Sequence, residues 1–260
     1  MSRPATAARL RAKWAAFYAL NVYLPFSSLA ANLRKHTRSL RGCQDRNQSA
    51  GRLREIKWRE AIASKPIHLV ESKKRKGNVR LSELAVLAKA AALVPPGQEI
   101  VEIGTFDGRT TLNLAVNSAP TSRVFTIDLP AKTQTKLPLR AGEREFIDKP
   151  VSGERYGKCA APWRDASAKI VQFLGDSAAY DWLAHYGKAG LVFVDGSHSY
   201  QYALSDSELA FRLAGPGAMI VWHDYGVWKG VTQALDELES TRNLGLRRVR
   251  GTSLVFARAK

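Results

Sequence analysis

Short apolar runs that alternate with helical stretches are the feature that most constrains the fold of this chain. Five nearly continuous runs recur from about residue 100 onward, at 100–103, 124–127, 170–174, 191–194 and 219–222. Strands whose side chains are covered on both faces have this pattern, as in a parallel sheet. Strands that alternate with helices form βαβ units with right-handed crossovers. The sequence therefore predicts a doubly wound, Rossmann-like α/β fold with helices on both faces of a mostly parallel sheet.

The C-terminus breaks this alternation. Residues 246–250 and 253–258 have the pattern of two strands, with only Gly251 and Thr252 between them. Because two residues leave no room for a crossover helix, we expect an antiparallel hairpin at the end of the sheet. Upstream of the sheet, apolar residues at helical spacing over 81–91 predict a helix that ends before the Pro-Pro-Gly that follows it.

Charge divides the chain into two parts. Residues 1–80 carry 19 Lys and Arg against 4 Asp and Glu, whereas residues 81–260 carry 21 against 19. We therefore place a basic, partly helical extension at residues 1–77 and a globular domain at 78–260. A segment this basic is attracted to nucleic acid or to an acidic membrane surface, unless it is a solvated arm with no specific partner.

Within the extension, the first 35 residues contain an apolar stretch that follows four basic residues and superficially resembles a secretion signal. Asn21 and Pro25 interrupt the stretch, which is shorter than the roughly 20 apolar residues of a membrane span. An interfacial amphipathic helix and a plain helix packed on the domain both fit this pattern. Further along, we expect a polar linker at 42–52 and a short helix at 53–64.

The loop after the first apolar run has the pattern E-x-G-x-x-x-G, from Glu102 through Gly104 to Gly108. Glycines let the backbone approach a ligand closely, and the N-terminus of the next helix faces the polar end of that ligand. Acids follow the next two strands, at Asp128 and at Asp176. A glycine turn alone is weak evidence, but four matches in order at strand ends favour a cofactor site.

The sequence resembles the bacterial class I methyltransferases that use S-adenosylmethionine (SAM), among them the macrocin-type O-methyltransferases and, more distantly, the catechol-type enzymes. The resemblance runs from about Asn78 to Arg258 and leaves residues 1–77 outside. It is specific for fold and cofactor, and much less so for substrate. It rests on VEIGTFDGRTT, VFTIDLP, FLGDSAAYDW, LVFVDGSHSY, IVWHDYGVW and GTSLVFAR.

For SAM, each acid has an expected contact. Asp128 can accept hydrogen bonds from both ribose hydroxyls, Asp176 can reach the adenine amino group, and Glu102 can hold the methionine ammonium through water. Taken singly, each acid also fits a helix cap or a surface position. The predicted cofactor-binding residues are Glu102, Gly104, Thr105, Phe106, Gly108, Asp128, Asp176 and Ser177.

Two further acids, Asp195 and Asp224, stand at the ends of adjacent strands. These ends border the crevice in which a doubly wound sheet binds ligands. Two carboxylates that meet there repel each other unless a proton or a cation intervenes, so we expect a divalent metal such as Mg, Mn or Fe. His198 is placed to take a proton from a substrate hydroxyl. The resemblance assigns catalytic roles to Asp195 and His198, and a second metal carboxylate to Asp224.

His223 departs from the resemblance, because the relatives tend to have a carboxylate immediately before the second aspartate. A nitrogen ligand favours Mn²⁺, Fe²⁺ or Zn²⁺ over Mg²⁺. The alternative is that His223 contacts the substrate. The predicted metal ligands are thus Asp195, His223 and Asp224. In the competing interpretation no metal binds, His198 caps the following helix, and Asp195 contacts only the cofactor.

The sequence therefore predicts a SAM-dependent O-methyltransferase that acts on a small-molecule hydroxyl, in the cytoplasm or peripheral to the membrane. One alternative is methylation of RNA or protein, with the basic arm as the binding segment. Another is a hydroxylase-like or purely binding member of the same fold. The polar stretch 131–168 is predicted to cover the active site. The sequence does not predict the oligomeric state.

Overall fold

The computed structural model describes residues 51–62, 65–148, 151–159 and 162–260, which belong to one compact unit. The predicted helix within the first 35 residues and nearly all of the predicted linker at 42–52 lie outside the described residues. Within the described part of the chain, no helix has the length and apolar character that a membrane crossing requires.

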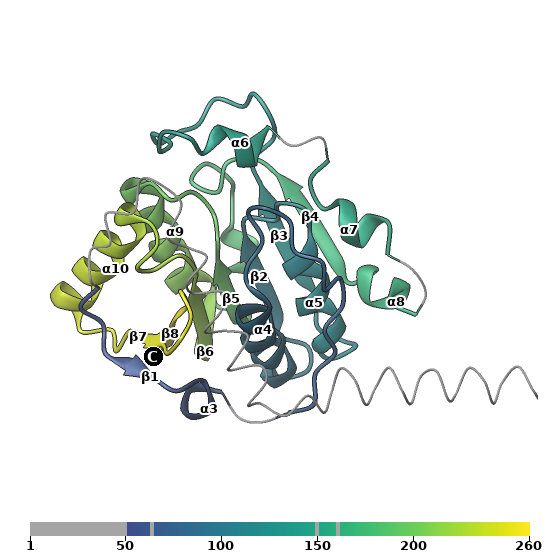
Figure 1. Ribbon diagram of the computed structural model, residues 1–260. Coiled ribbons are helices and arrows are strands. Elements are labelled where there is room, and N and C mark those ends of the chain that lie inside the picture. The colour runs from purple at the N-terminus through teal and green to yellow at the C-terminus, as the bar shows by residue number, and fades with distance from the viewer. Residues whose placement is uncertain (1–50, 63–64, 149–150, 160–161) are drawn as a thin grey trace, which may run out of the picture. The chain divides into compact units, whose positions relative to one another are not determined.

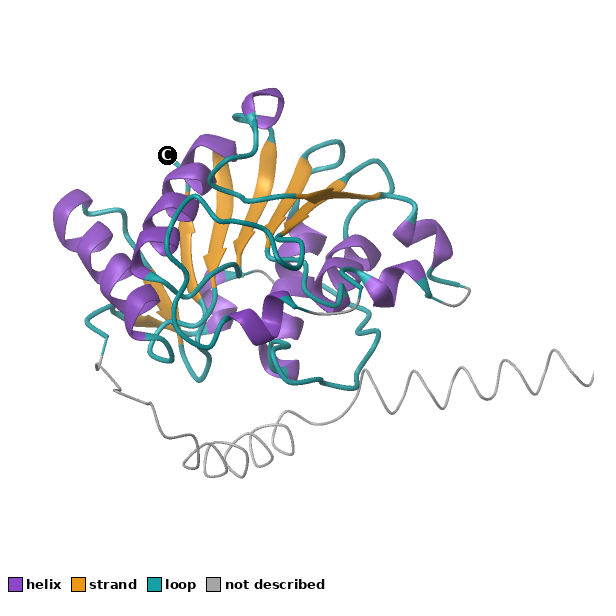
Figure 2. Cartoon of the chain, turned by 90° about the horizontal axis from the view of Figure 1, so that it is seen from above, coloured by secondary structure: helices purple, strands orange, loops and turns teal. Residues whose placement is uncertain are grey.

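An eight-stranded sheet forms the centre of this unit (Figures 1 and 2). The strands are β1 (Glu55–Ile56), β2 (Glu99–Ile103), β3 (Val124–Asp128), β4 (Ile170–Leu174), β5 (Ala189–Val194), β6 (Ala214–Trp222), β7 (Arg247–Val249) and β8 (Val255–Arg258). Their order across the sheet is β1-β7-β8-β6-β5-β2-β3-β4. Among the strand pairs of the described residues, only β6–β8 and β7–β8 are antiparallel. The predicted mostly parallel sheet with a terminal hairpin is confirmed.

Side chains of successive residues in the central strands enter two different cores, one on each face of the sheet. In β5, Leu191 and Phe193 belong to one core and Val192 and Val194 to the other. Helices α4 (Leu81–Leu93) and α5 (Arg109–Asn117) contribute to the first core, and α9 (Tyr200–Leu213) and α10 (Lys229–Arg242) to the second. Helices therefore lie on both sides of the sheet (Figure 2), and this double coverage explains the continuous apolar runs.

The start of the described chain differs from the prediction of a helix over residues 53–64. Among the described residues 53–62 of that range, only Trp58–Ala61 are helical (α3), whereas β1 pairs in parallel with β7 at the edge of the sheet. Main-chain hydrogen bonds to a distant strand thus outweigh the local helical pattern. Ala61 and Ile62 are buried in one of the two cores, so this part of the predicted extension packs on the domain.

The polar stretch 131–168 joins β3 to β4 and contains three short helices. They are α6 (Arg144–Ile147), α7 (Glu154–Gly157) and α8 (Arg164–Ser167). We call this stretch the insertion. A single turn of 3-10 helix, η2 (Leu183–His185), precedes β5.

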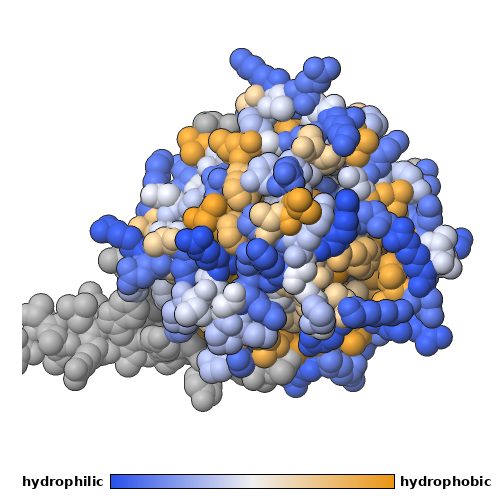
Figure 3. All heavy atoms as spheres, turned by 180° about the vertical axis from the view of Figure 1, so that it is seen from behind, coloured by the Kyte–Doolittle hydropathy of each residue, from blue (hydrophilic) through white to orange (hydrophobic). Residues whose placement is uncertain are grey.

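Apolar side chains on the face turned away from the viewer in Figure 1 form separate small groups among hydrophilic ones (Figure 3). Large apolar side chains that stay exposed in the described part of the chain are few and come from different elements: Leu81, Val151, Leu174, Leu183, Tyr186 and Val227. Isolated apolar residues of this kind are ordinary on a protein surface.

Candidate functional site

The loops that follow β2, β5 and β6 meet at the carboxyl ends of these strands. The main-chain N–H of Asp195 donates to the carbonyl of Ile103 (2.8 Å), and that of His223 to the carbonyl of Val194 (3.0 Å). Gly104 has a φ of +101°, and a Cβ there would lie 2.1 Å from the carbonyl oxygen of Asp195. Glycine is therefore required at Gly104 because the chain after β5 comes close, whereas the sequence suggested the approach of a ligand.

Glu102 is fully buried on β2. Its Oε2 accepts hydrogen bonds from the hydroxyls of Thr126 (2.8 Å) and Thr111, whereas its Oε1 has no hydrogen-bond partner. Thr105 extends the network, with its hydroxyl 2.7 Å from that of Thr126. Burial raises the pKa of Glu102 to about 8, although the two hydroxyls favour the ionised form. A buried acceptor without a donor marks a position where a ligand can donate.

The two acids at the ends of β3 and β4 are engaged by the protein itself. Asp128 accepts a hydrogen bond from the Ser152 hydroxyl on the insertion. Asp176 accepts from the main chain of Lys136 (2.7 Å) and from the hydroxyl of Tyr202 (2.6 Å). Its other oxygen accepts from the Ala178 N–H (2.9 Å), which is a local turn cap. These bonds suit the structural interpretation of Asp176, and its contact with adenine stays a prediction.

The side chain of Ser177 forms its hydrogen bond with α9 and not with the predicted cofactor loop. Its hydroxyl donates to Asp206 on α9 (2.7 Å). Burial raises the pKa of Asp206 to about 7, although this hydroxyl favours its charged form. Ser177 is thus tied to α9, and a role in cofactor binding stays a prediction.

The insertion lies directly on the loop after β2. The N–H groups of Gly153 and Arg155 donate to the carbonyls of Phe106 and Asp107 (both 2.9 Å). A Cβ on Gly108, whose φ is +80°, would lie 2.9 Å from the Cα of Gly153. The buried guanidinium of Arg155 also donates to the Asp107 carboxylate (2.8 Å). The stretch predicted to cover the active site therefore covers the predicted cofactor loop.

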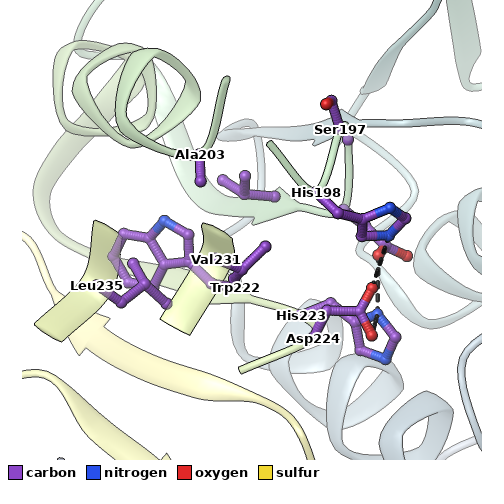
Figure 4. Close-up of a pocket in the computed structure, with 11 residues that line it drawn as sticks. Ser197, His198, Ala203, Trp222, His223, Asp224, Val231 and Leu235 are labelled. Atoms are coloured by element: carbon purple, nitrogen blue, oxygen red, sulfur yellow. Dashed lines mark hydrogen bonds and ion pairs between the residues drawn. The ribbon is translucent and has the colours of Figure 1, made fainter. Parts of the chain in front are cut away.

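Asp195, His223 and Asp224 come together at the ends of β5 and β6. Figure 4 shows two of them, His223 and Asp224, next to His198. His223 Nδ1 lies 2.8 Å from Asp195 Oδ1 and 3.3 Å from Asp224 Oδ1. One ligand atom from each of the three residues falls within 4.8 Å of the others. Asp224 also has a φ of +66°, in the left-handed region that a non-glycine residue rarely adopts. Such strained residues cluster at functional sites.

His198 stands between two carboxylates. Its Nε2 lies 2.8 Å from Asp224 Oδ2, and its Nδ1 lies 2.8 Å from Glu143 Oε1. The ring stacks on Trp228, with centroids 4.5 Å apart and planes at 22°. The cap of α9 is Ser199, whose hydroxyl accepts from the Tyr202 N–H (3.2 Å), so His198 does not have that role.

Two acids that the sequence analysis missed complete the site. Glu83 is 1% exposed on α4, and its Oε2 lies 3.3 Å from His223 Nε2. Glu143 is 3% exposed on the insertion and contacts His198. We call the six residues together the acid–imidazole cluster: Glu83, Glu143, Asp195, His198, His223 and Asp224. An Arg80-x-x-Glu83 pattern at the start of α4 was a visible sign of capping, but neither acid carried a sign of its contact with a histidine.

Charge in this cluster is balanced by pairing. Burial disfavours the charged imidazoles, but Asp224 and Glu143 raise the pKa of His198 to about 9, and the surrounding acids raise the pKa of His223 well above its usual value. Burial likewise raises the pKa of Asp195. For the other three acids, the histidine contacts outweigh burial and lower the pKa. The histidines are therefore held as cations.

Comparison with known proteins agrees with the fold described above. Residues 101–225, from β2 to the residue after Asp224, match the family model described as a methyltransferase domain. An O-methyltransferase from Bacillus cereus, solved in complex with SAH, has a similar fold, with a TM-score of 0.51 and 16% identity over 72% of this chain and 84% of that chain. No curated protein matches the chain.

A further solved structure with lower structural similarity is the O-methyltransferase TomG from Streptomyces achromogenes, in complex with SAM. Its TM-score is 0.48 and its identity 17%, over 74% of this chain and 93% of that chain. The domain match and the fold confirm the predicted class: residues 101–225 match a methyltransferase domain, and the chain has a class I methyltransferase fold.

Proposed function

We propose that this protein transfers a methyl group from SAM to a hydroxyl oxygen of a small molecule, with a divalent cation beside the acceptor. The observation that carries the proposal is the position of the acid–imidazole cluster. Its Asp195 follows β5, and the main chain of Asp195 touches Gly104 in the loop after β2. A proton acceptor and a set of metal ligands thus border the predicted cofactor loop.

The residues around that loop fit SAM. Glu102 Oε1 is buried without a partner, so it can accept from the methionine ammonium, directly or through water. Asp128 already accepts one hydroxyl, from Ser152, in the manner expected for a ribose hydroxyl. Bound SAM supplies a methyl group made reactive by its sulfonium, so the protein needs mainly to align the acceptor and to remove its proton.

Asp195, His223 and Asp224 fit a divalent metal. Two carboxylates and one imidazole form a mixed oxygen and nitrogen set that suits Mn²⁺, Fe²⁺ or Zn²⁺ better than Mg²⁺. The other ring nitrogen of His223 faces Glu83, and ligand histidines usually donate to a carboxylate in this way. A bound cation would lower the pKa of the acceptor hydroxyl.

In the proposed reaction, the acceptor oxygen forms a bond to the methyl carbon while the carbon–sulfur bond breaks. The bonding electrons go to sulfur, which leaves the neutral thioether S-adenosylhomocysteine (SAH), and the hydroxyl proton goes to His198. His198 must first lose its own proton, because the flanking carboxylates raise its pKa to about 9 in spite of burial.

The alternatives rest on fewer observations. Methylation of RNA or protein was suggested by the basic extension, most of which lies outside the described residues. Arg75 and Lys76, at its end, pair with Glu154 and Glu145 of the insertion. These two side chains therefore form ion pairs within the domain. Use of SAM as the cofactor favours the cytoplasm, where SAM is available.

The test is formation of SAH by the purified full chain with SAM and a panel of hydroxyl acceptors, namely catechol and monosaccharides, with Mn²⁺, Mg²⁺ or EDTA. We expect SAH with at least one acceptor and its loss in His198→Gln. The exposed His68→Gln is the matched control and should stay active. SAH formed only with RNA would replace the proposal by the first alternative. SAM binding without SAH from any acceptor would favour a binding protein.

A further inference from the structure

The insertion contributes one acid that is unlike its neighbours. Glu143 is 3% exposed, whereas Arg144 and Glu145 beside it are exposed. A carboxylate is buried at a high free-energy cost unless charged or hydrogen-bonding groups surround it. The contacts of Glu143 therefore show what holds it inside.

Each carboxylate oxygen of Glu143 has two contacts. Oε1 accepts a hydrogen bond from the main-chain N–H of His198 and forms an ion pair with Nδ1 of the same residue (2.8 Å), without the geometry of a hydrogen bond. Oε2 accepts from the Ser197 hydroxyl (2.9 Å) and from the N–H of Arg140 (2.7 Å). Three of these four contacts go to the loop after β5, so the acid is directed at the loop that carries His198.

The same stretch reaches the face of the His198 ring by a second path. Arg140, one turn before Glu143, lies over Trp228, with its guanidinium carbon 4.1 Å from the ring centroid. Trp228 in turn stacks on His198 at 4.5 Å. The ring is thus held at its Nδ1 edge by Glu143 and against one face by Trp228. Only Nε2, which points to Asp224, is directed at the predicted metal ligands.

We propose that Glu143 is a positioning residue: it fixes the orientation of the His198 ring, so that Nε2 is the ring nitrogen that faces Asp224 and the acceptor. Glu143 has this effect because its ion pair with Nδ1 holds the ring and its hydrogen bond to the main-chain N–H of His198 holds the backbone of the same residue. The insertion is then part of the catalytic apparatus as well as a cover for the cofactor loop. This inference rests on the proposed role of His198 as the base.

A purely structural role is the competing explanation, in which Glu143 only ties the insertion to the domain. Glu143→Gln separates the two, because glutamine keeps the size and can still accept from main-chain N–H groups, but it loses the charge next to Nδ1. Glu143→Asp keeps the charge on a shorter side chain. Glu145→Gln is the matched control, since Glu145 is an exposed acid in α6, the helix that begins directly after Glu143, and it pairs with Lys76.

The first measurement needs no acceptor. Nitrogen-15 spectra of the imidazoles, recorded on the full chain without added metal at one fixed pH, report the surroundings of each His198 ring nitrogen. The signals are assigned with His198→Gln. We expect Glu143→Gln to shift the Nδ1 signal, Glu143→Asp to shift it less, and Glu145→Gln to leave it unchanged. Identical spectra for wild type and Glu143→Gln would overturn the proposal, whatever the reaction of this protein proves to be.

The second measurement uses the best acceptor of the panel described above. We expect Glu143→Gln to lower kcat by about tenfold to 100-fold with little change in KM, as for other residues that orient a functional histidine. SAM binding by calorimetry should be the same in both proteins. Equal kcat values for Glu143→Gln and Glu145→Gln, or a loss of SAM binding that accounts for the lower rate, would leave Glu143 only a structural role.

Discussion

Two regions of this protein bury acids in opposite ways. Glu102 and Asp206 lie among hydroxyl groups, and burial raises their pKa values to about 8 and about 7. In the acid–imidazole cluster, the acids pair with His198 and His223, and most of their pKa values are lowered. The acids of the first region are neutralised by protonation up to about pH 7, whereas those of the second are neutralised by ion pairs with the histidines.

This difference indicates which kind of ligand each region can bind. A cationic ligand can ionise Glu102 without breaking an existing ion pair, because Oε1 has no partner. A metal in the cluster must instead displace a proton from His223, whose Nδ1 faces Asp195. The first region is therefore suited to a cation that carries its own hydrogen-bond donors, and the second to proton transfer coupled to metal binding.

The largest expected effect comes from Asp224→Asn, which removes the carboxylate that both histidines share. We expect SAH formation to fall by at least about 100-fold, the scale of general acid–base catalysis alone. Binding of SAM should persist, because Glu102 is untouched. Asp148→Asn, an exposed aspartate on the insertion, is the control. Equal rates for the two variants would show that the ion pairs of the cluster have no part in the reaction.

An intermediate effect is expected for Glu102 on cofactor binding. Since the SAM ammonium favours the ionised acid, affinity should rise with pH up to about 8, by up to about tenfold per pH unit. Glu102→Gln should flatten this dependence and weaken binding at pH 8 by about tenfold or more, as for loss of a charged hydrogen bond. Glu99→Gln on the same strand is the control, and calorimetry at several pH values is the measurement. A pH-independent affinity in the wild type would contradict this role.

The smallest expected effect is on stability. The pKa of Asp206 is raised in the folded protein, so its contribution to stability is full below its unfolded value near 3.8 and is lost as pH rises through about 7. Asp206→Asn lacks this loss. Its free energy of unfolding should therefore gain on the wild type between pH 4 and pH 7, by at most about 1.4 kcal/mol per pH unit, and level off above. The measurement is denaturant unfolding of both proteins at several pH values. If the free energies of unfolding of wild type and Asp206→Asn change with pH in parallel, Asp206 is not buried in a protonated state.

Much of the fold followed from the sequence because β2, β3, β5 and β6 are covered on both faces and leave continuous apolar runs. The helix α4 was found for a similar reason, with its end marked by Pro95 and Pro96. The strand β1 was missed. Two residues carry no periodic pattern, and their pairing partner in β7 lies almost 200 residues away in the chain, a separation that local propensity does not report.

The site residues likewise fall into those that the sequence predicted and those that it missed. Asp195, His198, His223 and Asp224 were found because they follow strands that end at the same edge of the sheet. Glu143 was hidden in a charged stretch typical of solvent-exposed loops, where only its burial in three dimensions distinguishes it. The expected contacts of Asp176 and Ser177 remain predictions, because the sequence does not show how the insertion packs against the strand ends.

The short strand β1 has a consequence for how the protein behaves among other copies of itself. A strand at the edge of a sheet presents unpaired N–H and C=O groups that can pair with another chain. The main chain of β7 would be such an edge, but N–H groups of Arg248 and Arg250 donate to carbonyls of Arg54 and Ile56 (both 2.9 Å). The edge is then reduced to two residues, of which Glu55 is charged. The chain thereby carries its own protection against intermolecular strand addition at this end of the sheet.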